Sequence, residues 1–246
     1  LGPPPAGAWR TSFYASGTRS RNDHEAFDGH DEHSAIWHVQ HFTMTDTTAS
    51  VARGFGGGVG LEAVTFLRHV TTRIRFEDLD RRPIVVPDGD IHHRNETLVG
   101  PGDPWLMAVA GRRLGPWSAA LRGGISIPLG KTEENPFELG RRGRSHQHIQ
   151  FGTGTWDPLA GLGVARRFGE VVTSGSLLAR LPVSTNRHGY RPGRRVQVTT
   201  AVDRRIRGGH GAAIEPQRAD AGALRAFDII APGVAHHHGR VRRAAA

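Results

Sequence analysis

The sequence predicts an all-β protein, an antiparallel transmembrane β-barrel of at least ten strands, and three observations carry this prediction. Apolar residues recur at every second position over many stretches, which is the period of a strand with one apolar face. The 246 residues include 33 glycines and 15 prolines, a composition that suits curved strands and turns. Very short connections are interspersed with long polar ones, as in barrels that cross an outer membrane.

The alternation is clearest in the segments 117–130, 171–183 and 193–206. In the first of them, Trp117, Leu121 and Ile125 share one phase, and Ser118 and Arg122 occupy the other. A strand of about ten residues with its apolar phase toward lipid and its polar phase toward the interior is typical of a transmembrane barrel. No run approaches 18 consecutive apolar residues, which excludes a transmembrane helix.

We expect strands near 9–19, 35–54, 59–75, 99–114, 117–130, 146–156, 159–168, 171–183, 193–206 and 224–235, in a single domain over residues 1–246. Short turns are predicted at Gly56 to Gly58, at Leu114 to Pro116 and at Asp157-Pro158. Long polar loops are predicted near 20–34, 76–98, 131–146 and 207–222. One irregularity follows, because this strand order assigns the very short connection at 168–171 to the long-loop end.

A soluble, secreted β-sandwich that binds metal or a polyanion is the alternative fold. Its strands would show the same alternation, but their apolar face would have to fill a core with larger side chains and fewer glycines. In the barrel interpretation, Leu162, Val164 and Phe168 instead face lipid, and Asp157-Pro158 closes a tight periplasmic turn.

Three short motifs in the middle of the chain resemble a known family. They are Gly100-x-Gly102-Asp103, Pro128-x-Gly130-Lys131 and Gly152-Thr153-Gly154-x-x-Asp157. The region from 100 to 195 resembles the outer-membrane barrel family named for the meta-pathway of phenol degradation, whose members are often identified as transporters. The resemblance implies passage of a small solute, with an aromatic compound as the substrate suggested by the family's name. The family usually continues with further strands after Pro232 to Val234, so one interpretation is that the last strand or two is missing.

Arginines dominate the polar phase of the cleanest strands. If the apolar phase faces lipid, Arg122, Arg180, Arg195 and Arg205 point inward and line the pore. A narrow lumen lined by cations would favour anions. The alternative is that these arginines pair with carboxylates from other strands, such as Glu62, and brace a filled interior. Such a barrel would be a structural partner in the envelope.

Several polar loops carry residues that could bind a ligand or could simply be solvated. The loop with His24, Glu25, Asp28, His30, Asp31, Glu32 and His33 could hold zinc, copper or nickel, but it has no fixed ligand spacing, and no cofactor or metal is predicted. The run from His236 to His238 is a weaker signal. Basic loops at 141–148 and 187–195 could bind lipopolysaccharide phosphates.

The composition bounds the remaining classes. The formal net charge is +9, but the arginines are scattered and no nucleic-acid motif is present, so no nucleic-acid partner is expected. No nucleophile and base form a known catalytic motif, so an enzyme is not expected. The absence of cysteine excludes a disulfide framework. Localisation in the outer membrane of a Gram-negative bacterium is the expectation, with membrane lipid as the partner and the oligomeric state left open.

Overall fold

The computed structural model describes residues 2–27, 35–86, 95–135, 138–139, 142–145 and 149–204. In this part of the chain the fold is all-β, a single antiparallel sheet of ten strands. The strands are β1 (Trp9–Phe27), β2 (Ala35–Gly56), β3 (Val59–Glu77), β4 (Pro83–Ile84), β5 (Glu96–Pro101), β6 (Trp105–Leu114), β7 (Trp117–Ser126), β8 (Asp157–Phe168), β9 (Val171–Arg180) and β10 (Arg195–Arg204).

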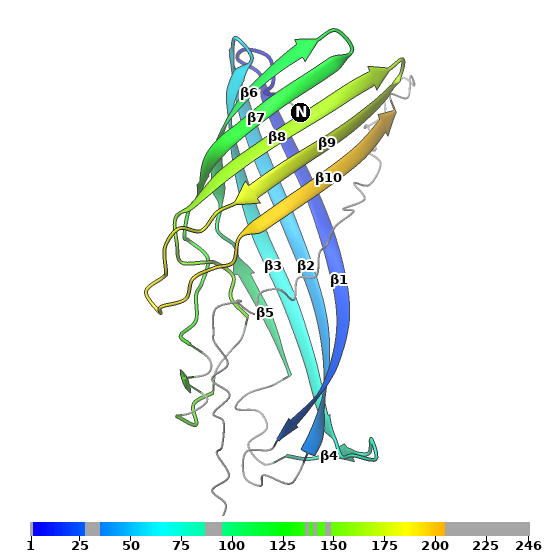
Figure 1. Ribbon diagram of the computed structural model, residues 1–246, viewed down its shortest axis with the longest axis vertical. Coiled ribbons are helices and arrows are strands. Elements are labelled where there is room, and N and C mark those ends of the chain that lie inside the picture. Colours follow the sequence, from blue (N-terminus) through cyan, green and yellow to red (C-terminus); the bar gives the residue numbers. More distant parts are fainter. Residues whose placement is uncertain are drawn as a thin grey trace, which may run out of the picture.

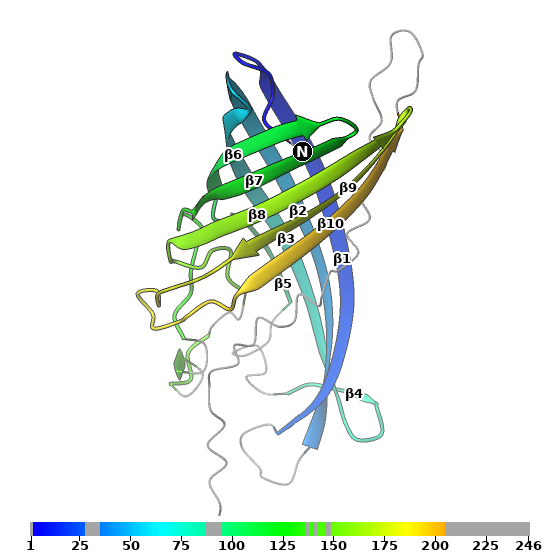
Figure 2. The same ribbon diagram turned by 45° about the horizontal axis from the view of Figure 1, so that its top comes forward.

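The sheet is curled into a half-barrel (Figures 1 and 2). The strand order is β1-β2-β3-β6-β7-β8-β9-β10, and β4 and β5 pair with β3 beside this path. The two edges of this order, β1 and β10, are not paired with each other in the described part of the chain. β5 and β6 pair with successive parts of β3, so together they replace the single strand predicted over 99–114.

Short and long connections lie at opposite ends of the sheet, as predicted. One end of the sheet, here called the tight-turn end, is at the top of Figure 1. It holds three two-residue turns, at Gly57–Gly58, at Gly115–Pro116 and at Gly169–Glu170. Gly115 and Gly169 adopt φ of 61° and 60°, a conformation that a residue without a Cβ reaches at no steric cost. The long connections lie at the opposite, loop end.

The structure corrects further predictions besides the strand at 99–114. Residues 149–156 form no strand, and Asp157-Pro158 is no turn, because Asp157 begins β8. With the strand at 146–156 removed, the connection at 169–170 falls at the tight-turn end, which removes the irregularity in the predicted order. β1 continues through Phe27, so the loop predicted near 20–34 begins later than expected. The strand predicted at 224–235 lies outside the described residues.

One phase of the strands forms an exposed apolar band on the convex face. The register aligns a row across β7 to β10, in which Leu121 is opposite Leu162, Leu162 is opposite Leu177 and Leu177 is opposite Val198. All four side chains are exposed, Leu121 to 65%. Nothing in the described residues covers this band. The alternation predicted for 117–130 and 193–206 is therefore confirmed within β7 and β10, whereas in β9 every residue except the exposed Leu177 is half-buried.

Aromatic side chains mark the tight-turn edge of the band. The guanidinium of Arg53 lies 5.0 Å from the ring centre of Trp9. The guanidinium of Arg166 lies 4.9 Å from the ring centre of Trp117 and 4.6 Å from that of Phe168. Each contact combines a large apolar ring with a cation, a pair suited to a boundary between apolar and aqueous surroundings.

The glycines Gly123 and Gly124 give a matched test of the packing on the two faces. A Cβ at Gly124 would lie 2.7 Å from Met107 Cα, whereas a Cβ at Gly123 would meet nothing within 4 Å. We expect Gly124→Ala to lower the free energy of unfolding by about 1–3 kcal/mol through overpacking, and Gly123→Ala to change it little. Urea titration of the protein folded in detergent measures both. Equal losses would contradict the packing described for this strand.

Candidate functional site on the concave face

The concave face carries the second phase of the strands. Arg195 on β10 interacts electrostatically with Tyr14, Asp46 and Arg68, which lie on β1, β2 and β3. These strands are at the other end of the sheet order, so the side chains approach one another only across the hollow side of the curl. Residues that are directly opposite each other on neighbouring strands lie on the same face of a sheet, so the register extends this assignment from Arg195 to the other strands.

Three of the four arginines predicted to line a pore lie on this face. Arg180 and Arg195 are directly opposite each other on β9 and β10. Arg122 on β7 is opposite Gly161, which is opposite Leu178, two residues before Arg180 on the same face. Arg205 lies outside the described residues, so its position remains a prediction.

Carboxylates neutralise part of this charge. Arg122 Nε lies 3.2 Å from Glu62 Oε2, the partner that the sequence suggested as an alternative to a free arginine. Arg68 donates to both carboxylate oxygens of Asp46, at 2.7 and 3.2 Å. The contacts that join β3 to β2 and to β7 brace the wall against lateral displacement of its strands.

Arg180 and Arg195 are less completely neutralised. Arg180 Nε lies 3.8 Å from Asp157 Oδ2, which is too long for a hydrogen bond. Among the described residues, Arg195 has no hydrogen bond or ion pair, and it is accessible to solvent. The group of Arg68, Arg122, Arg180 and Arg195 therefore faces three carboxylates, those of Asp46, Glu62 and Asp157, with one positive charge in excess.

Unused hydrogen-bonding atoms gather beside Arg180. Ser126 Oγ, Asp157 Oδ2 and Arg180 Nε are buried and have no hydrogen-bond partner in the described part of the chain. Ser126 is directly opposite Asp157, so these atoms lie at the adjoining ends of β7, β8 and β9. Burial raises the pKa of Tyr190 in the following loop, and the charge of Arg180 opposes this shift. On the concave face, this cluster combines two donors, Ser126 Oγ and Arg180 Nε, with one acceptor, Asp157 Oδ2.

An apolar cluster fills another part of the concave face. Val64, Met107 and Leu159 are buried together, and Phe66, Trp105 and Leu178 pack against them. The rings of Phe66 and Trp105 meet edge to face with their centres 4.6 Å apart. The sequence did not reveal this cluster, because residues 105–109 are apolar in both phases and give no alternation.

The three glycine motifs converge on one buried carboxylate. Asp103 accepts hydrogen bonds from Gly130 N at 2.9 Å, from Thr153 N at 2.6 Å and from Thr153 Oγ1 at 2.9 Å. Gly130 and Gly152 approach closely, since a Cβ at Gly130 would lie 2.6 Å from Gly152 Cα. Asn186 Nδ2 donates to the Thr153 carbonyl at 3.0 Å. The motifs thus fasten loop-end segments to the strands.

The N-terminal segment lies across the concave face at the tight-turn end, where Figure 1 marks the start of the chain. Gly7 N donates to the Gly54 carbonyl at 2.9 Å, and Arg10 Nη1 donates to the Gly2 carbonyl at 2.8 Å. A Cβ at Gly111 would lie 2.8 Å from Gly2 Cα. Glycines on the wall therefore provide the space that residues 2–6 occupy.

The predicted ligand loops are described only in part. The side chains from His24 to His33 and the run from His236 to His238 lie outside what the structure describes, so the metal hypothesis stays a prediction. The basic loop at 187–195 is described and leads into β10.

Among the described residues, no helix combines the length and apolar character needed to cross a membrane. A scan against protein-family models, a search of curated proteins and a search of solved structures each found no significant match.

Proposed function

We propose that the protein is an outer-membrane β-barrel that passes a small solute along its concave face. The observation that carries the proposal is the uncovered apolar band on the convex face, with aromatic side chains and arginines at its tight-turn edge. A contiguous apolar band of this kind marks a surface that something else covers. Lipid suits a band that follows the strands around a curved sheet.

The polar concave face supports passage rather than simple anchoring. In a soluble β-sandwich the apolar phase would be buried against a second sheet, and the arginine phase would face water. Here the apolar phase is exposed and the arginine phase faces the hollow. The proposed location is the outer membrane of a Gram-negative cell, because barrels with short turns at one end and long loops at the other are typical of that membrane.

The excess positive charge beside Arg180 and Arg195 favours a small anion as the solute. An aromatic compound remains the alternative that the family resemblance implies. The two solute classes differ in charge, so conductance under a salt gradient separates them.

We expect the double variant Arg180→Gln/Arg195→Gln to shift the reversal potential toward lower anion preference in a planar bilayer. Removal of these cations leaves the carboxylates of Asp46, Glu62 and Asp157 with fewer partners, so the local charge changes sign. Arg166→Gln, which removes a convex arginine, is the matched control and should leave the potential unchanged. An unchanged potential in the double variant would rule out these arginines as the selective element.

A second candidate function is a filled, structural envelope barrel. It is favoured by the apolar cluster around Met107 and by the N-terminal segment on the concave face. Liposome swelling with a panel of solutes distinguishes the two, because a filled barrel passes none of them. Migration on a gel with and without boiling tests the barrel itself, since a folded barrel migrates differently when unboiled.

A further inference from the structure

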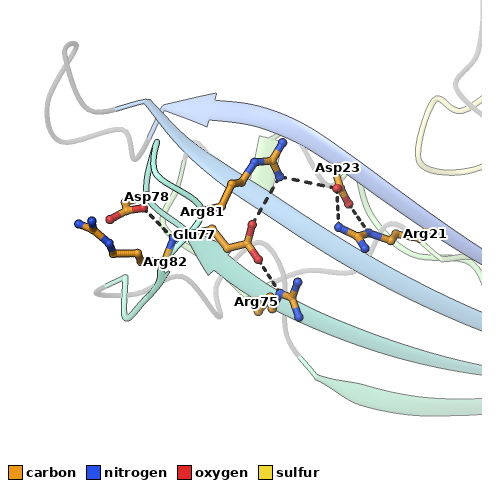
Figure 3. Close-up of polar contacts among 7 residues, drawn as sticks. All are labelled: Arg21, Asp23, Arg75, Glu77, Asp78, Arg81 and Arg82. Atoms are coloured by element: carbon orange, nitrogen blue, oxygen red, sulfur yellow. Dashed lines mark hydrogen bonds and ion pairs between the residues drawn. The ribbon is translucent and has the colours of Figure 1, made fainter.

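The convex face of β1, β2 and β3 changes character toward the loop end. On β3, the convex residues Leu61, Ala63 and Leu67 give way to polar and basic ones. The basic side chains on this part of the face and on the hairpin after β3 form what we call the arginine patch: Arg19, Arg21, His41, Arg73, Arg75 and Arg81. Figure 3 shows its carboxylate-linked part.

The register places basic side chains in adjacent positions. Arg21 is directly opposite His41, and His41 is directly opposite Arg73, so the three form one row across β1, β2 and β3. Arg19 lies in the neighbouring row, opposite Thr43. Neighbouring strands are about 4.8 Å apart, so this row gathers two guanidinium groups and an imidazole on one part of the face, where an anion can reach all three.

Among the described residues, the carboxylates of Asp23 and Glu77 already have arginine partners. Arg21 donates to both oxygens of Asp23, at 3.0 and 2.8 Å, and this hydrogen bonding lowers the pKa of Asp23. Arg75 Nε lies 2.8 Å from the buried Glu77 carboxylate, and Arg81 Nη1 contacts both Glu77 and Asp23, at 3.4 and 3.6 Å (Figure 3).

Two arginines are left over by these contacts. Within the described residues, neither Arg19 nor Arg73 has a carboxylate partner. Arg73 Nη1 donates only to the backbone carbonyl of Thr72, at 3.2 Å. The network in Figure 3 therefore holds part of the patch in place, and Arg19 and Arg73, which are exposed, stand outside this network.

The position of the patch along the strands indicates which part of the membrane lies beside it. Arg73 is six residues beyond Leu67 on β3, which corresponds to about 20 Å along a tilted strand. If the apolar band spans the hydrocarbon core, as in the proposed function on which this inference rests, the patch lies outside the core, at the loop end. In a barrel with short periplasmic turns, that end faces the outer leaflet.

We propose that the arginine patch binds the phosphate groups of lipopolysaccharide in the outer leaflet. Guanidinium groups bind phosphate through two parallel hydrogen bonds, a geometry that suits Arg19 and Arg73. A lipid that carries several phosphates can bind Arg19 and Arg73 at the same time, which a single free phosphate does not.

The test compares the wild-type chain with Arg19→Gln/Arg73→Gln and with Arg112→Gln, which removes a convex arginine near the tight-turn end. Each protein, folded in detergent micelles, is titrated with purified lipopolysaccharide, with its dephosphorylated form and with inorganic phosphate. We expect the double variant to bind lipopolysaccharide at least about tenfold more weakly than wild type, and Arg112→Gln to bind like wild type.

Several results would overturn the proposal. They are equal weakening by Arg112→Gln, equal binding of the dephosphorylated form, and full competition by millimolar inorganic phosphate, which would indicate a small-anion site. Unboiled gel migration of each variant reports whether the barrel is folded. If the wild type shows no heat-modifiable form, the proposed function fails. If it folds and does not bind lipopolysaccharide, only the patch proposal fails.

Discussion

Replacing Asp103 with alanine is expected to lower the free energy of unfolding by about 3–5 kcal/mol. The carboxylate is buried and accepts hydrogen bonds from Gly130 N, Thr153 N and Thr153 Oγ1. Alanine would leave these donors without an acceptor in a site from which solvent is excluded, and each buried unsatisfied donor costs about 1–3 kcal/mol, less than additively for neighbours. Urea titration of the detergent-folded protein measures the loss.

The control for this prediction is Asp78→Ala. Asp78 Oδ1 accepts one exposed hydrogen bond from Arg82 N at 2.8 Å, so its removal should cost well under half as much as the Asp103 change. Thr153→Val should fall between the two variants, because it removes the hydroxyl donor and keeps the backbone bond. A small effect of Asp103→Ala would mean that the glycine motifs do not depend on this carboxylate.

The same network explains where sequence reasoning failed. Residues 149–156 alternate like a strand, but their backbone N–H groups at Phe151 and Gly152 donate to the Lys131 carbonyl and that of Thr153 donates to Asp103. Acceptors from segments distant in the sequence thus take the place of a neighbouring strand. No periodicity in the sequence reports such a competition, because it depends on a carboxylate 50 positions away.

The face on which each side chain lies could be predicted for strands with one apolar phase, but not for strands in which both phases are apolar. In β7, Leu121 lies on the convex face and Arg122 on the concave face. A register shift of β7 by one residue would therefore place the arginine within the apolar band. In β6 both phases are apolar, and only the register shows that Trp105 and Met107 belong to the concave cluster. Opposite charge alone was enough to suggest Glu62 as a partner for Arg122. The two side chains meet only because the strand order brings β3 and β7 close together on the concave face.

Leu121→Arg is expected to reduce the free energy of folding into lipid vesicles by about 2–4 kcal/mol. Leu121 lies at the middle of β7, on the convex face, and is 65% exposed. At the centre of a bilayer an arginine has to leave water or distort the membrane, whereas on a soluble protein the same change at an exposed site costs almost nothing. Urea titration of refolding into phosphatidylcholine vesicles gives the difference directly.

Leu129→Arg is the matched control, because Leu129 is 68% exposed but lies beyond the end of β7, outside the band. The two leucines differ in place and hardly in exposure, so accessible area alone predicts the same small effect for both. A bilayer around the band predicts a large loss at Leu121 and little at Leu129. Small, equal effects would instead support the soluble sandwich, and the exposed row from Leu121 to Val198 would then require a protein partner to cover it.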